Sequence, residues 1–79
     1  MKKFEEPSSF YDEAIKLIDL DDYYGAIKSI KMNIDSIESL EDIALAYLNC
    51  GFLNDRLGNM SYAIDDFSKS VFFEAKLDI

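Results

Sequence analysis

The sequence predicts an all-α protein of four helices that fold as two tandem antiparallel helix-turn-helix hairpins in a single domain, residues 1–79. Four segments carry apolar residues at helical spacings of three and four, and no segment alternates with the period of two that is typical of a strand. The 79 residues include only 3 glycines and 1 proline, too few turn residues for a many-stranded β fold.

Two helices are expected in the first half of the chain, at about 7–20 and 22–37. Pro7 suits a first helical turn, and Asp21 or Asp22 can cap the second helix by accepting an N–H hydrogen bond. The predicted inner faces are Phe10, Ala14 and Leu17 in the first helix, and Tyr23, Ala26, Ile27, Ile30, Ile34 and Ile37 in the second.

The second half predicts helices at about 40–57 and 60–77. Ser39 is placed to cap the third helix, Gly58 to end it, and Asn59 to cap the fourth. The predicted inner face of the fourth helix is Ala63, Ile64, Phe67 and Val71.

The chain repeats itself with an offset of 37 residues, so that repeat one covers about 7–38 and repeat two about 44–77. The offset aligns residues of like size: Phe10 with Tyr47, Ala14 with Gly51, Tyr23 with Met60, Ala26 with Ala63, Ile27 with Ile64, Ile30 with Phe67 and Ile34 with Val71. Small residues at corresponding places let two helices approach closely.

At these residues the sequence resembles the tetratricopeptide repeat (TPR) family. Repeat two matches the family pattern at Tyr47, Gly51, Gly58, Ala63, Phe67 and Ser70, and repeat one at Phe10, Ala14, Tyr23 and Ala26. Repeat one departs at Asp21, where the family has glycine. The resemblance implies a right-handed α-solenoid fragment that acts as a protein- or peptide-binding scaffold, in an adaptor or chaperone-like role, and not as an enzyme.

A second apolar stripe on the first and third helices predicts a partner groove, because an ordinary surface helix needs only one stripe. Asn49 and Tyr11 could orient the partner by hydrogen bonds. The alternative is that a tilt of the first helix buries part of this stripe. The predicted groove residues are Tyr11, Ile15, Ile18, Leu45, Leu48, Asn49 and Phe52.

The end of the chain carries apolar residues where a repeat stack needs a polar outer face. We expect these residues, Phe72, Phe73, Leu77 and Ile79, to be buried in a homo-oligomer, most simply a two-fold dimer. A missing downstream helix is the other way to cover them. An alternative function is a structural oligomerisation module whose groove is filled by a sister subunit.

Composition excludes several classes of site. With no histidine and one cysteine, the chain cannot form a Ser-His-Asp triad, a zinc finger or an internal disulfide, and we expect no catalytic residue, metal or cofactor. Cys50 is expected to be an inert packing residue. The net charge of −8 argues against binding nucleic acid or an anionic membrane. No signal peptide or membrane span is recognisable, so the expected location is cytoplasmic.

Overall fold

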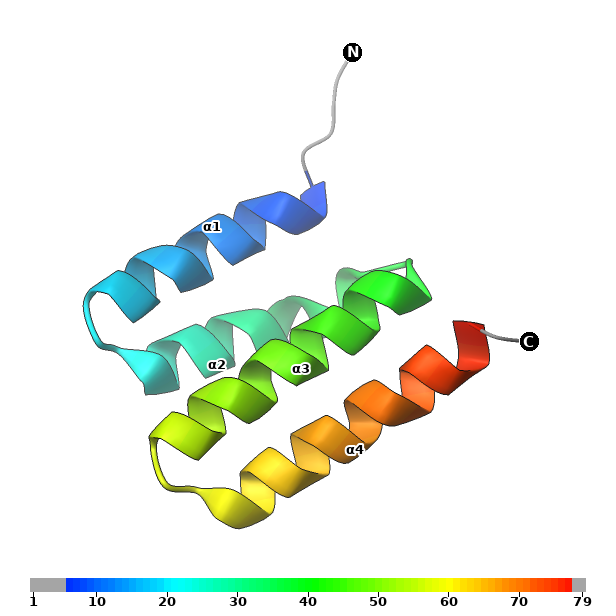
Figure 1. The fold of residues 1–79 in the computed structure, drawn as a ribbon. Coiled ribbons are helices and arrows are strands. Elements are labelled where there is room, and N and C mark those ends of the chain that lie inside the picture. Colours follow the sequence, from blue (N-terminus) through cyan, green and yellow to red (C-terminus); the bar gives the residue numbers. More distant parts are fainter. Residues whose placement is uncertain (1–5, 78–79) are drawn as a thin grey trace.

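A computed structural model describes the backbone of residues 6–77 and the side chains of residues 12–77; within these residues the chain is helical and has no strand (Figure 1). The helices are α1 (Glu6–Asp19), α2 (Tyr23–Asn33), α3 (Leu40–Arg56) and α4 (Met60–Leu77), and a short 3-10 turn, η1 (Ile34–Ser36), follows α2. The predictions of an all-α protein and of its four helices are confirmed.

The helices pack in chain order, α1 on α2, α2 on α3 and α3 on α4 (Figure 1). Each short turn reverses the chain, so α1 and α2 form one hairpin and α3 and α4 another. The packing within each hairpin is more extensive than the α2–α3 contact that joins the two. The result is a thin molecule, with principal dimensions of 40 × 33 × 15 Å.

Side-chain caps begin two of the helices at the expected residues. An Asp22 carboxylate oxygen accepts the Gly25 N–H at 3.0 Å ahead of α2, and the Ser39 hydroxyl accepts the Asp42 N–H at 3.3 Å ahead of α3. Each cap satisfies an N–H that has no partner within the helix. Asn59 directly precedes α4, where its carbonyl accepts the first helical N–H bond.

The predicted end of the second helix is wrong. α2 ends at Asn33 and gives way to η1, and Ile37 is extended, with φ −83° and ψ 125°. Asn33, Asp35 and Ser36 are poor helix formers because their side chains compete for backbone hydrogen bonds. Asn33 shows this directly, since its side-chain amide donates to the Ser29 carbonyl at 2.7 Å. Ile37 is nevertheless buried, as the apolar pattern predicted.

The main core lies between the first hairpin and α3. Its buried residues are Ala14, Ala26, Ile30, Ile37, Ala46, Cys50 and Leu53, and half-buried Leu17, Tyr23, Ile27 and Ile34 pack against them. The predicted inner face of α2 is thereby confirmed.

The predicted inner face of α4 is partly wrong. Ile64 and Val71, expected inside, are 62% and 67% exposed, whereas Ala63, Asp66 and Ser70 are buried. α4 is therefore rotated so that a face of small and polar side chains meets α3.

Close approach of α3 and α4 explains this rotation. A Cβ added at Gly51 would lie 2.5 Å from the Phe67 ring, so the bare glycine backbone makes room for that ring. One turn further along α4, the Ser70 hydroxyl donates to the Ala44 carbonyl at 2.8 Å. A large aliphatic residue at position 63 or 70 would hold the two backbones apart.

The same turn ends the first helix of each hairpin. Asp21 has φ 61° and Gly58 has φ 79°, both in the left-handed region. In each turn the N–H of the left-handed residue donates to the carbonyl three residues before it, and the N–H of the following residue donates to the carbonyl five residues before itself, at 2.8–3.0 Å. This pair of hydrogen bonds is a Schellman motif. Position 21 therefore requires the conformation that glycine supplies at position 58.

Asp21→Gly is expected to stabilise the protein by about 0.5 kcal/mol, because it removes the steric cost of a Cβ at positive φ. The converse change, Gly58→Ala, should cost about 1 kcal/mol through backbone strain alone, since no atom lies within 4 Å of the added Cβ. Thermal unfolding of both variants checks this. Asp21→Asn, which removes the charge but keeps the Cβ, is the control; equal gains from glycine and asparagine would contradict the strain argument.

Candidate functional site

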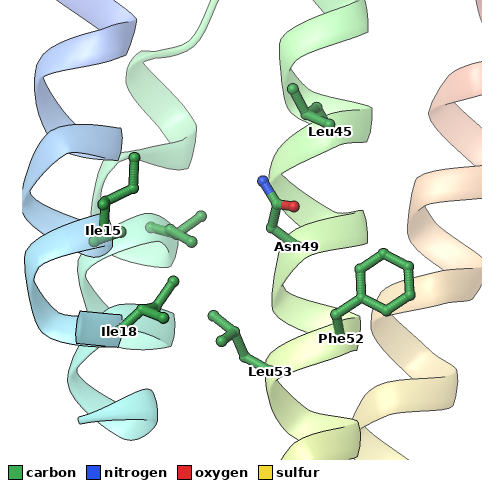
Figure 2. Close-up of a pocket in the computed structure, with 8 residues that line it drawn as sticks. Ile15, Ile18, Leu45, Asn49, Phe52 and Leu53 are labelled. Carbon is green, nitrogen blue, oxygen red and sulfur yellow. The ribbon is translucent and has the colours of Figure 1, made fainter. Parts of the chain in front are cut away.

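An apolar groove opens between α1 and α3 and has a volume of about 440 Å³. Ile15 and Ile18 of α1 form one wall, and Leu45, Asn49 and Phe52 of α3 form the other (Figure 2). Three buried residues, Ala14, Ile30 and Leu53, complete the lining. The two walls therefore belong to different hairpins.

Helical spacing creates each wall. Residues three apart on α1 and three or four apart on α3 lie on one side of a helix, so their side chains face the same gap. Figure 2 shows Ile15 and Ile18 on one side of that gap and Leu45 and Asn49 on the other, with the Phe52 ring turned towards α4. Asn49 is the polar member of the lining, and its amide can both donate and accept a hydrogen bond.

The structure brings five of the seven predicted groove residues into this lining: Ile15, Ile18, Leu45, Asn49 and Phe52. Leu48 is half-buried and does not line the groove. The side chain of Tyr11 falls outside the described residues. The lining also includes Ala14, Ile30 and Leu53, which were not predicted to belong to the groove.

Phe52 is held by an aromatic contact with α4. Its ring meets the Phe67 ring edge to face, with the centroids 5.3 Å apart and the planes at 73°. Such a contact restricts the ring while leaving much of its surface in water. The α3 wall of the groove therefore includes one anchored aromatic side chain.

A buried ionic cluster lies at the junction of the hairpins. The Asp66 carboxylate of α4 is 2.8 Å from the Lys31 ammonium of α2, and it accepts a hydrogen bond from the Asn54 amide of α3, also at 2.8 Å. The Asp66 side chain is 1% exposed and that of Lys31 is 39% exposed. The cluster joins three helices and both hairpins.

The pKa values of Lys31 and Cys50 follow from this cluster. Burial lowers the Lys31 pKa, but the contact with the Asp66 carboxylate and its charge outweigh that effect, so the pKa is raised overall. Burial of the Cys50 thiol, reinforced by the negative charge of Asp66, raises its pKa to about 12. The thiol is therefore neutral at physiological pH and is a poor nucleophile.

The cluster was not predicted from the sequence, because Asp65 and Asp66 look alike as neighbouring acids on a helix. The available signal was position: Asp66 is three residues after Ala63 and four before Ser70, so it shares their face of the helix. By contrast, Asp65 is exposed and pairs with Lys69 at 3.4 Å.

The residues predicted for oligomerisation lie in different settings. Phe72 and Leu77 are exposed, whereas Phe73 is half-buried and stacks on Tyr47 with a centroid distance of 5.8 Å. Ile79 falls outside the described residues. Phe73 therefore packs within its own chain.

Comparison with protein-family models, curated proteins and solved structures finds no match for this chain. The TPR resemblance therefore stays a prediction. Among the residues whose side chains are described, no group of three or more acidic or cysteine side chains is placed to hold a metal ion. Over the described part of the chain, every helix falls short of the length and apolarity that a membrane crossing requires.

Proposed function

We propose that this protein is an interaction scaffold that binds an amphipathic helical segment of a partner protein in the α1–α3 groove. The observation that carries the proposal is the open apolar lining, in which Ile15 and Leu45 are 54% and 45% exposed on opposite walls. Apolar surface left in contact with water at a concave site favours association with another apolar surface. The hairpin arrangement supports a TPR-like solenoid fragment as the framework of this scaffold.

The chemistry of the groove specifies the kind of segment. An apolar helix face, with side chains repeating every three or four residues, would insert between Ile15 and Leu45, and a polar group on that face would meet Asn49. The chain carries a net charge of −8, so basic residues flanking the apolar face would be attracted and acidic ones repelled. The proposed partner segment is apolar on one side and basic on the other.

A synthetic fluorescent peptide with leucines on one helix face and lysines elsewhere tests the proposal by fluorescence anisotropy. Ile15→Asp/Leu45→Asp is expected to weaken binding at least about tenfold, because the new carboxylates would have to be desolvated against leucine. The native chain should bind a peptide with glutamates in place of the lysines more weakly than it binds the basic peptide.

The matched control is Leu20→Asp/Met32→Asp, which makes the same change of charge at residues that are 74% and 72% exposed and outside the groove. It should bind the basic peptide as the native chain does. Circular dichroism confirms that both variants fold. The proposal fails if the native chain does not bind the peptide, or if the groove and control variants bind equally.

A further inference from the structure

α4 presents an apolar stripe to water. Met60, Ile64 and Val71 are all more than half exposed, and their spacings of four and seven place them on one side of the helix. Ala75 continues the stripe and is also exposed. None of these residues belongs to the groove lining, so this surface is separate from the proposed binding site.

The internal repeat shows how the equivalent stripe is used in the first hairpin. With the offset of 37, Met60 and Ile64 correspond to Tyr23 and Ile27 of α2, and Val71 corresponds to Ile34 of η1. Those three side chains are half-buried against the core cluster to which α3 contributes Ala46, Cys50 and Leu53. The stripe of the first hairpin is thus partly covered by the core, whereas the corresponding stripe of the second hairpin is open.

Another copy of the chain cannot cover the α4 stripe by continuing the stack head to tail. In the repeat alignment α1 corresponds to α3, so a copy stacked head to tail would place its α1 on this stripe. At the positions that correspond to Cys50 and Leu53, α1 has Glu13 and Lys16. Both side chains are exposed and charged. Docking this face on Ile64 and Val71 would desolvate a glutamate and a lysine against aliphatic side chains, which is costly even where the two charges pair with each other.

The stripe is, however, complementary to itself. If two α4 helices cross antiparallel about a two-fold axis between Phe67 and Ser68, Ile64 of each copy meets Val71 of the other, and Met60 meets Ala75. The large residue at one end of the stripe is thus matched to the small one at the other. Ser68, a small residue beside the axis, lets the two backbones approach.

We infer that the protein forms a two-fold dimer through the Met60–Ile64–Val71 stripe of α4, which leaves the α1–α3 groove open in each copy. The stripe itself carries no charged side chain, so its burial desolvates none. Phe72 adjoins Val71 at the edge of this interface, whereas Phe73 remains stacked on Tyr47 within its own chain.

Sedimentation equilibrium from about 1 µM to about 1 mM tests the dimer. The mass of the native chain should rise with concentration from 9.1 kDa towards twice that value. Ile64→Asp/Val71→Asp should remain monomeric throughout, because four carboxylates would meet at the interface. Leu20→Asp/Met32→Asp, which has the same charge, should dimerise as the native chain does.

Cysteine cross-linking tests the antiparallel register. Ser68→Cys places a thiol beside the two-fold axis and should give a disulfide-linked dimer under mild oxidation. Ser61→Cys, on the same side of α4 but far from the axis, should not. The native Cys50 can stay in both variants because it is fully buried.

Three results would overturn the inference. One is a native chain that stays monomeric over the whole concentration range. Another is a dimer that survives Ile64→Asp/Val71→Asp but is lost in Ile15→Asp/Leu45→Asp, which would place the second copy in the groove. The third is equal cross-linking at positions 61 and 68, which would reject the two-fold register. None of these outcomes depends on whether the basic peptide binds.

Discussion

Lys31→Met is expected to lower the free energy of unfolding by about 3–5 kcal/mol, because it leaves the Asp66 carboxylate buried without its cation. Asp66 is 1% exposed and would keep the Asn54 amide as its remaining partner. A domain of this size has a stability of only about 3–5 kcal/mol, so the variant should be largely unfolded at 25 °C. Urea denaturation followed by circular dichroism measures the loss.

The chain offers a matched control for this substitution. Lys69 pairs with Asp65 on the exposed side of α4, where both side chains are about half exposed. Lys69→Met should cost less than about 1 kcal/mol, as is usual for a surface pair. The double variant Lys31→Met/Asp66→Asn should recover at least half of the lost stability, since it removes the unpaired charge. Equal losses at positions 31 and 69 would show that burial of Asp66 has no energetic consequence.

Stability should also fall steeply between pH 9 and pH 12 because of Cys50. Its pKa is 9.0 in an ordinary environment and about 12 in the fold. A group whose pKa is raised by folding stabilises the protein fully below its ordinary pKa, and that contribution is lost as the pH rises towards the folded value. The loss should reach about 3 kcal/mol by pH 11, at 1.36 kcal/mol for each pH unit. The raised pKa of Lys31 acts in the same direction at higher pH.

Cys50→Ala separates the thiol from the other groups that titrate in this range. The variant should be less stable than the native chain at pH 7 by about 1–2 kcal/mol, because a small cavity replaces the sulfur. Its stability should decline less between pH 9 and pH 11, so the two curves should converge and then cross before pH 11. Urea midpoints at each pH provide the measurement, and two parallel curves would rule out the thiol as the cause.

Helix positions could be predicted from this sequence because local chemistry decides them. Asp22 and Ser39 cap helices, and Gly58 ends one, through hydrogen bonds and dihedral angles that involve only neighbouring residues. The early end of α2 at Asn33 was missed because the apolar spacing continued beyond it. Periodicity reports which residues are buried, and Ile37 is buried without being helical.

The orientation of α4 could not be predicted, because it depends on contacts between distant residues. Hydropathy alone favours Ile64 inside and Asp66 outside, and the structure shows the reverse. The close approach of Gly51 to Phe67 and the cation supplied by Lys31 make the polar face the better one to bury. The groove was easier to predict, since its walls depend on the helical spacing of α1 and α3.

The division of the groove between two hairpins has a mechanical consequence. Ile15 and Ile18 move with one hairpin, and Leu45, Asn49 and Phe52 with the other. A change in the distance between the two walls therefore requires a movement at the junction of the hairpins, where α3 packs in the main core and Lys31 binds Asp66. The width of the groove is thus set by the same core contacts that hold the two hairpins together.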